Sequence, residues 1–290
     1  MKPAKLLKRY RVEHGKGFKL KHYDPADDGG LTLEREEAAV LLDTTQRHLA
    51  EMQDKLYAQD RWAVLCIFQA MDAAGKDSTI RHVFSGLNPQ GCEVTSFKAP
   101  TALELDQDYL RRHIATLPRR GHIGIHNRSW YEEVLVTRVH PAILERQKLP
   151  PELMGKHIFR DRLEDIAATE RYIARQGTII LKFFLHVSPE EQRRRFLSRI
   201  EEPAKNWKFS PDDVMERQHW AEYQAAYQDA IQATAAPHAP WYVVPADRKW
   251  FMQLVVAEAI MAAMEPLGLA YPEPDEATRA RLEEARRLLG

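Results

Sequence analysis

Five short runs of apolar, β-branched or aromatic residues recur along the chain, and longer segments of helical period separate them. The runs cover residues 62–68, 92–97, 122–125, 178–187 and 241–244. Apolar residues at helical spacing occupy 76–85, 103–117, 131–147, 160–176 and 211–234. Short strands that alternate with helices are typical of an α/β fold, in which crossover helices connect parallel strands. The pattern therefore predicts a parallel sheet of about five strands flanked by helices.

Two of the predicted helices have marked starting points. Ser188 and Ser210 are each followed by a proline and, three residues after the serine, by an acid. A hydroxyl at the N-cap, a proline at N1 and an acid at N3 together favour a helix start. These starts leave residues 199–209 as a charged loop between two helices.

The two ends of the chain lie outside the alternating region. A helix is predicted over 34–59, and a charged helix is predicted after Pro272. We therefore expect an N-terminal extension over residues 1–58, a main domain over 59–272 and a helical tail over 273–290. Both ends are expected to be peripheral to the sheet.

Composition narrows the class of protein. Hydrophobic residues make up 44% of the 290 residues, which is enough for a large core and too much for a disordered chain. The 42 basic and 42 acidic side chains balance, so no field over the whole molecule attracts nucleic acid or an anionic membrane. The apolar stretches 62–71 and 254–264 are shorter than the roughly 18 to 20 residues of a membrane-spanning helix. We expect a globular cytoplasmic protein without membrane or nucleic-acid partners, whose two cysteines are core thiols.

The first predicted strand leads directly into a candidate phosphate-binding loop. Residues 69–78 read Gln-Ala-Met-Asp-Ala-Ala-Gly-Lys-Asp-Ser, and helical period resumes at once. In a strand, loop and helix of this kind, backbone amides and the helix N-terminus point at an anion, while a lysine adds a mobile charge. The residues assigned to phosphate binding are Ala73, Ala74, Gly75, Lys76, Asp77 and Ser78.

The loop departs from the consensus G-x-x-x-x-G-K-[ST] at two positions. Ala70 stands at the first glycine, and Asp77 replaces the hydroxyl that would bind Mg²⁺. The other Gly-Lys pairs, at 15–16 and 155–156, do not follow a buried-strand pattern, so context supports the loop at Lys76. A tight strand-to-helix turn with a solvated lysine is the structural alternative.

A carboxylate inside this loop points to a metal ion. Asp72 would repel a phosphate unless a divalent cation lies between them or the carboxylate serves to position a hydroxyl, and we favour the cation. Mg²⁺, with Mn²⁺ as an alternative, shares one or two carboxylates with substrate phosphates and water, so a single acid is sufficient. Otherwise, Asp72 is an ordinary acid at a helix N-terminus, where the helix dipole stabilises it.

Cations follow several of the predicted strands. In doubly wound sheets, ligands bind beyond the carboxyl ends of the strands. Lys98 follows the second strand, Arg128 the third, and Arg248 with Lys249 the fifth. Because the chain as a whole is neutral, this gathering predicts a local site for an anionic ligand.

Two polar residues after the third strand, Asn127 and Glu132, bear on the charge of this predicted anion site. Asn127 stands where P-loop enzymes commonly have a metal-orienting aspartate, and its carbonyl can coordinate without adding charge. Glu132 either returns the missing negative charge to the site or is an ordinary acid at a helix start.

The charged segment over about residues 193–213 has two interpretations. It is either a solvated face or a lid that supplies charge to a transition state and excludes water. Its cations are Arg193, Arg194, Arg195, Arg199, Lys205 and Lys208.

Seven motifs together resemble the second family of polyphosphate kinases, the polyphosphate:nucleotide phosphotransferases. They lie in the family order between Tyr10 and Pro272, and they read AMDAAGKDS, NPQGC, FKAP, HNRSWYEEVLV, LKFFLHVS, EEPAKNWKFS and PWYVVPADRKW. The resemblance implies a P-loop kinase fold related to thymidylate kinase, with a helical lid. It also implies Mg²⁺ dependence, reversible phosphoryl transfer between inorganic polyphosphate and AMP, ADP or ATP, and a homo-oligomer, either a dimer or a tetramer.

The same resemblance assigns roles to residues. Asp72 and Lys76 match the family's loop, and Asn127 with Arg128 matches its second motif, which often reads Asp-Arg. Glu132 stands where members restricted to one phosphorylation step usually have asparagine, so the chain resembles the subgroup that accepts both AMP and ADP. The resemblance assigns polyphosphate binding in the lid to Lys205 and Lys208. It assigns nucleotide binding to Lys98, Arg128, Glu132 and Arg138.

Two other functions fit parts of the sequence. The phosphate loop alone also fits an ATP-dependent nucleoside monophosphate kinase. A protein that binds polyphosphate or nucleic acid without turnover fits the departures at Ala70 and Asp77 and the basic N-terminal segment.

Overall fold

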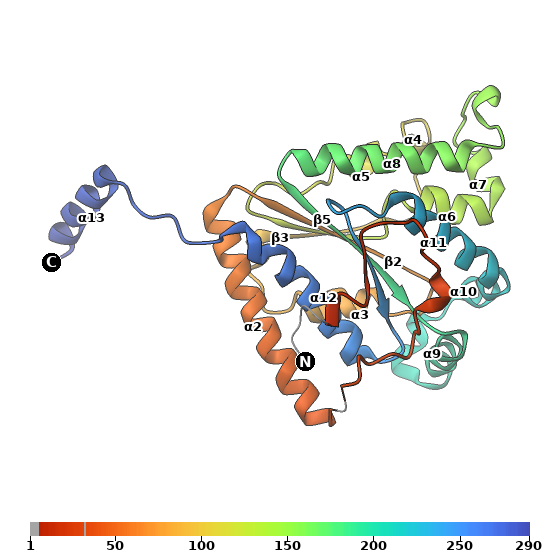
Figure 1. Ribbon diagram of the computed structural model, residues 1–290, viewed down its shortest axis with the longest axis horizontal. Coiled ribbons are helices and arrows are strands. Elements are labelled where there is room, and N and C mark those ends of the chain that lie inside the picture. The colour runs from red at the N-terminus through yellow and green to blue at the C-terminus, as the bar shows by residue number, and fades with distance from the viewer. Residues whose placement is uncertain (1–5, 32) are drawn as a thin grey trace.

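The computed structural model describes residues 6–31 and 33–290, so residues 1–5 of the basic N-terminal segment and residue 32 lie outside it. Within this part of the chain, six strands form one sheet in the order β1-β6-β5-β2-β4-β3 (Figure 1). The strands are β1 (Arg11–Val12), β2 (Ala63–Ala70), β3 (Cys92–Ser96), β4 (Ile123–Asn127), β5 (Thr178–His186) and β6 (Trp241–Pro245). Neighbours pair in parallel, except β1, which is antiparallel to β6. The predicted α/β fold with five parallel strands is confirmed, and β1 is an additional edge strand.

The N-terminal segment takes part in the sheet and the core, so the expectation that it is peripheral to the sheet is wrong. Val12 lies opposite Trp241, and the backbone N of Val243 donates to the carbonyl of Tyr10 at 2.9 Å. Burial of apolar side chains on either side of β1 stabilises this arrangement. The buried side chains include Leu6, Leu7, Phe18 and Leu20.

Helices cover both faces of the sheet (Figure 1). On one face, α12 (Lys249–Met264) packs against α2 (Arg35–Gln59) and α3 (Lys76–Val83). On the other, α11 (Trp220–Thr234) packs against α6 (Glu132–Val139) and α8 (Ile158–Arg175). The other α-helices are α4 (Ala102–Leu105), α5 (Arg111–Ile114), α7 (Pro141–Glu145), α9 (Pro189–Glu201), α10 (Pro211–Met215) and α13 (Glu276–Leu289). Short 3₁₀ segments are η1 (Leu20–His22), η2 (Pro89–Gly91), η3 (Pro151–Leu153), η4 (Pro203–Lys208), η5 (Glu216–His219) and η6 (Glu265–Leu267).

An aromatic row connects three neighbouring strands. Phe68, Phe183 and Tyr242 lie side by side on β2, β5 and β6. Their rings stack with centroid distances of 5.0 and 5.5 Å. Stacked aromatic pairs contribute beyond their buried area. The row lies two residues before the end of β2, so it anchors the base of the loop that follows.

Three predicted helices are interrupted. The segment 103–117 contains α4 and α5 with a turn between them, and 211–234 contains α10, η5 and α11. The segment 131–147 divides into α6 and α7 at Pro141, which has no N–H to continue the helix. Ser188 caps α9 as predicted, with its Oγ accepting from the backbone N of Glu191 at 3.1 Å, whereas Ser210 makes no capping hydrogen bond.

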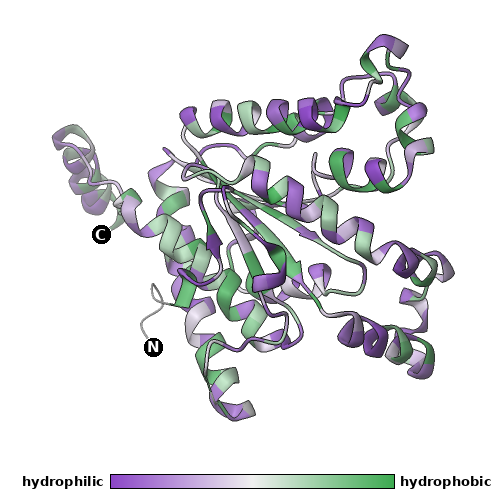
Figure 2. Cartoon of the chain, turned by 45° about the vertical axis from the view of Figure 1, so that its right-hand side comes forward, coloured by the Kyte–Doolittle hydropathy of each residue, from purple (hydrophilic) through white to green (hydrophobic). Residues whose placement is uncertain are grey.

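The chain around α12 is apolar. By length and composition alone, Lys249–Leu267 is a candidate membrane span, with a mean hydropathy of 1.3. In the fold, α12 packs between the sheet and α2, and its buried side chains include Phe251, Val255, Val256 and Ile260. Core packing therefore accounts for this hydropathy. The strands at the centre of the sheet are also coloured largely as hydrophobic (Figure 2). In contrast, α13 lies away from the body of the molecule, and its side chains are exposed (Figure 1).

Candidate active site

The ends of β2 and β4 bring the predicted residues together. Phe68 on β2 lies opposite Asn127 on β4, and β2 ends two residues later at the loop. Ala73 (φ 59°) and Gly75 (φ 106°) adopt left-handed conformations in this loop. At Gly75 an added Cβ would lie 3.2 Å from Ser78 Oγ, so glycine suits both the dihedral angle and the space. The loop turns sharply into α3, whose first amides have no intrahelical acceptor and are available to an anion.

Lys76 begins α3 and folds back over the loop. Its Nζ donates to the carbonyl of Ala70 at 3.1 Å. Burial, followed by the Arg128 cation, lowers the pKa of Lys76, and Asp72 and Glu132 act in the opposite direction. The lysine is therefore part of the loop and close to both signs of charge.

Arg128 follows β4 in a left-handed conformation (φ 68°), which is uncommon for residues other than glycine. Its backbone N donates to the carbonyl of Phe68 at 3.0 Å and so fixes the turn to β2. Its Nη1 lies 3.1 Å from Glu132 Oε2, and its Nη2 lies 3.7 Å from Asp72 Oδ1. Glu132, and more weakly Asp72, raises the pKa of Arg128 against the effect of burial. Three predicted residues thus form one charged cluster.

Asp77 and Asn127, which depart from the common P-loop pattern, contact each other. Asn127 Nδ2 donates to Asp77 Oδ1 at 2.6 Å and so connects the first turn of α3 to the end of β4. The hydroxyls of Ser78 and Thr79 both donate to the carbonyl of Gly75 at 2.9 Å. Asp77 therefore positions α3 through Asn127 in this structure.

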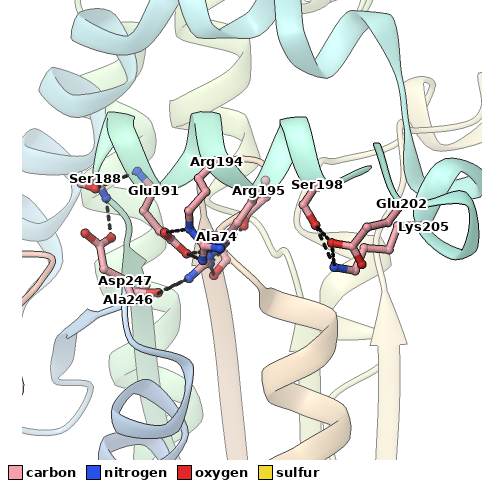
Figure 3. A network of polar contacts seen from close by, with 11 residues as sticks. Ala74, Ser188, Glu191, Arg194, Arg195, Ser198, Glu202, Lys205, Ala246 and Asp247 are labelled. Carbon is pink, nitrogen blue, oxygen red and sulfur yellow. Dashed lines mark hydrogen bonds and ion pairs between the residues drawn. The ribbon is translucent and has the colours of Figure 1, made fainter. Parts of the chain in front are cut away.

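Arg195 was grouped above with the cations of the lid, but its guanidinium is buried and holds the phosphate loop (Figure 3). Nη1 donates to the carbonyls of Ala73 and Ala74 at 3.1 and 2.5 Å. Gln192, one turn earlier on α9, donates from Nε2 to the carbonyl of Asp72 at 2.9 Å. Because of these hydrogen bonds, the loop carbonyls point toward α9. The backbone amides of the loop can then face the opposite side. The sequence signal was a glutamine and an arginine at i and i+3 on α9, which places both on one helix face.

Lys205 and Lys208, the lid lysines predicted to bind polyphosphate, contact residues of the lid itself. Lys205 Nζ donates to Ser198 Oγ at 2.7 Å and to Glu202 Oε1 at 2.6 Å (Figure 3). Lys208 Nζ lies 4.9 Å above the ring of Trp207. In the described part of the chain, neither lysine makes a hydrogen bond or ion pair with the phosphate loop. The chain after α9 forms a 3₁₀ segment, η4, and not an irregular loop.

A small cleft of about 50 Å³ adjoins the charged cluster of Asp72, Arg128 and Glu132. The sequence interpretation missed its far wall, which Glu216, Tyr223 and Tyr227 form with Val136. Glu216 Oε2 accepts from Tyr223 OH and pairs with His140 Nε2, both at 2.9 Å. The spacing of the two tyrosines, i and i+4 on α11, was the signal that they share a face.

Two predicted nucleotide contacts lie away from this cleft. Arg138 is on the last turn of α6, and its Nη1 pairs with Asp229 Oδ2 at 2.8 Å. Lys98 is exposed beyond β3, where its carbonyl accepts from Arg112 Nη1 at 2.9 Å. The structure does not bring either side chain to the charged cluster.

Asp72 is the residue best placed to bind a divalent cation next to bound phosphate. Its carboxylate lies in the loop, is partly exposed and faces the cleft. No group of three or more His, Cys, Asp or Glu side chains with metal-binding geometry occurs among residues 6–31 and 33–290. A hard cation that takes its other ligands from phosphates and water fits this donor set, whereas a metal held by protein alone does not.

The site combines three parts at the carboxyl edge of a parallel sheet: a phosphate loop after β2, an arginine after β4 and a cationic segment after α9. This combination defines a P-loop phosphotransferase. The chain matches the family described as Polyphosphate kinase 2 (PPK2) over residues 32–268, and it belongs to this family.

Relatives and a solved structure agree with this assignment. The chain is 48% identical over 283 residues to the ADP-polyphosphate phosphotransferase of Rhodopseudomonas palustris, covering 97% of this chain and 98% of the relative. It is 42% identical over 272 residues to the AMP/ADP-polyphosphate phosphotransferase of Meiothermus ruber, covering 94% and 98%. The crystal structure of Polyphosphate Kinase 2 from Arthrobacter aurescens TC1 superimposes with a TM-score of 0.87 at 36% identity, covering 98% and 97%. The P-loop kinase fold is thereby confirmed.

Proposed function

We propose that the protein transfers the terminal phosphoryl group of inorganic polyphosphate to AMP and to ADP, reversibly and with Mg²⁺. The observation that carries the proposal is the cluster in which Lys76, Arg128 and Asp72 meet at the phosphate loop, beside the small cleft described above. Family membership and the names of the relatives from R. palustris and M. ruber support the choice of donor and acceptors.

The reaction moves one phosphoryl group between two phosphate oxygens. An oxygen of the nucleotide's last phosphate attacks the terminal phosphorus of the chain, and the bond to the next bridging oxygen breaks. The attacking oxygen is already anionic, so no general base is required, and positioning with charge neutralisation is the main task. Lys76 and the amides of α3 would hold the transferred group. Arg128, oriented by Glu132, would neutralise charge between donor and acceptor.

Mg²⁺ would be held by Asp72, with phosphate oxygens and water as its other ligands. When bound, the ion supplies neutralisation of the crowded phosphate charges. The chain's own contribution is the rigidity of the loop. Gln192 fixes the backbone of Asp72 through its carbonyl, so the carboxylate is presented from a defined position.

We predict that the protein converts AMP to ADP and then to ATP when polyphosphate is the sole donor. The assay contains protein, Mg²⁺, AMP and polyphosphates of several chain lengths, and nucleotides are separated by anion-exchange chromatography. A parallel reaction with ATP in place of polyphosphate tests for an ordinary monophosphate kinase. Salt-sensitive binding of polyphosphate without any product would contradict the proposal and support the non-catalytic alternative.

We expect Glu132→Asn to lower kcat/KM for AMP more than for ADP. AMP has one phosphate fewer than ADP, so it has fewer contacts with the loop cations and depends more on Arg128, which Glu132 holds at 3.1 Å. Both constants are measured with polyphosphate at saturation, and Glu132→Gln, which keeps the side-chain length, serves as the matched variant. Equal losses for the two nucleotides would count against a selective role of Glu132.

A further inference from the structure

Arg217 lies where the chain returns from the lid. The lid covers about residues 193–213, and Arg217 is in η5, directly after α10. Its Nη1 donates to the carbonyl of Pro189 at 3.2 Å and to Gln192 Oε1 at 2.7 Å. Both acceptors are in the first part of α9, just before the lid. Arg217 therefore connects the two ends of the lid segment at its base.

The amide of Gln192 lies between Arg217 and the phosphate loop. Gln192 is 1% exposed, and its Nε2 donates to the carbonyl of Asp72 at 2.9 Å. A backbone carbonyl only accepts hydrogen bonds, and a guanidinium only donates them. One orientation of the amide therefore satisfies both neighbours, whereas the orientation rotated by 180° would place oxygen against oxygen at the carbonyl and N–H against N–H at the guanidinium. Because a buried polar atom is costly without a partner, Arg217 determines which end of the amide faces the loop.

The preceding residue of η5 supports the other side of the cleft. Glu216 lines the cleft together with Asp72 and Gln192. Its Oε2 accepts from Tyr223 OH on the cleft wall at 2.9 Å. Successive residues of one 3₁₀ turn thus contact the cleft wall and, through Gln192, the loop that carries Asp72. η5 is therefore a shared support for both sides of the cleft.

We propose that Arg217 is a positioning residue for phosphoryl transfer, which fixes the amide of Gln192 and through it the backbone of Asp72. The inference rests on the proposed function, in which the loop holds the transferred group. Arg217 acts through Gln192, to which its guanidinium is bonded. A small displacement of the loop disturbs the in-line alignment of donor and acceptor, and this affects the rate of transfer more than the binding of nucleotide.

Arg217→Met is expected to lower kcat with ADP and polyphosphate by about tenfold and to change KM for ADP by less than about twofold. Methionine fills the space of the aliphatic part of the arginine and removes the donor, so the Gln192 amide is no longer fixed. Arg217→Lys keeps a donor for Gln192 Oε1 and should recover part of the loss. The measurements are steady-state kinetics and the unfolding midpoint in urea. Equal kcat values for the lysine and methionine variants would overturn the inference.

Hydrogen exchange followed by mass spectrometry tests the loop directly. Arg217→Met should increase the exchange of amides in residues 69–78, because the loop loses its fixed bond to α9 through Gln192. A purely structural role would instead lower the urea midpoint and increase exchange across α9 and α11 without singling out the loop. Unchanged exchange in residues 69–78 would overturn the inference. Exchange does not depend on turnover, so it decides the inference even where wild-type protein fails to use polyphosphate, a result that would reject the proposed function itself.

The double variant Arg217→Met with Gln192→Leu tests whether the arginine acts through the glutamine. Leucine is similar in size to glutamine and lacks the amide, so Gln192→Leu alone should lower kcat at least as much as Arg217→Met. Adding Arg217→Met should then cause no further loss, because its path to the loop is already absent. Losses that multiply would show independent effects and contradict the proposal. Arg171→Met, which removes an exposed arginine from α8, is the matched control and should leave kcat and loop exchange at their wild-type values.

Discussion

Replacing Lys76 by methionine is expected to lower kcat for phosphoryl transfer by about 10²–10³-fold, the usual cost of removing one preorganised donor to transition-state charge. Lys76 Nζ donates to the Ala70 carbonyl. Arg128 lowers the pKa of Lys76, whereas Asp72 and Glu132 raise it. Methionine keeps the length of the side chain and removes the charge, so the loop should retain its shape. The measurement is steady-state kinetics with ADP and polyphosphate, together with the unfolding midpoint in urea.

The control for this variant is Lys156→Met, which removes an equivalent charge from the exposed Gly-Lys pair at 155–156 in the loop before α8. It should leave kcat unchanged. An unfolding midpoint close to that of the wild type would show that Lys76→Met acts on chemistry and not on the fold. Near-normal kcat for Lys76→Met would refute the role of the lysine.

The sheet and its phosphate loop were predictable because their signals are local and strong. The inner parallel strands β2, β5 and β6 are buried along most of their length and so appear as apolar runs, of which Ala63–Ala70 is the clearest. The loop follows that strand without interruption, and its Gly-Lys pair could be compared with two others that lack the context. The clustering of Asp72, Arg128 and Glu132 followed from the rule that ligands bind at the carboxyl ends of parallel strands.

Other features depend on tertiary contacts that leave no periodic signal. β1 has only two residues, so no alternation can be detected, and its pairing with β6 is decided by the burial of Leu6, Leu7 and Tyr10 around it. Arg195 belongs to a run of three arginines, of which Arg194 is exposed and Arg195 is buried against the loop carbonyls. The sequence alone does not indicate which of these adjacent arginines is buried. Only the packing of α9 on the loop decides which arginine faces inward.

Lys182→Met is expected to lower the free energy of unfolding by about 3–5 kcal/mol, because it removes one partner of a fully buried ion pair. Lys182 lies inside β5 with no exposed surface, and its Nζ donates to Glu170 Oε2 at 2.5 Å and to the carbonyl of Thr234 at 2.8 Å. Burial lowers the pKa of Lys182, and Glu170 opposes that shift. Without the lysine, the Glu170 carboxylate remains buried and has only neutral donors, including Tyr131 OH at 2.8 Å. Urea denaturation followed by circular dichroism measures the loss.

The double variant Lys182→Met with Glu170→Leu separates the cost of an unpaired charge from the value of the pair itself. Replacing both partners of a buried ion pair by apolar residues is often neutral or stabilising, so the double variant should recover most of the stability lost in Lys182→Met. Lys148→Met, which breaks an exposed pair with Asp106, should cost at most about 1 kcal/mol. A double variant less stable than Lys182→Met would contradict this account.

Tyr131 bonds Glu170 and immediately precedes Glu132 on the chain, so the same network also fixes the start of α6 beneath the charged cluster.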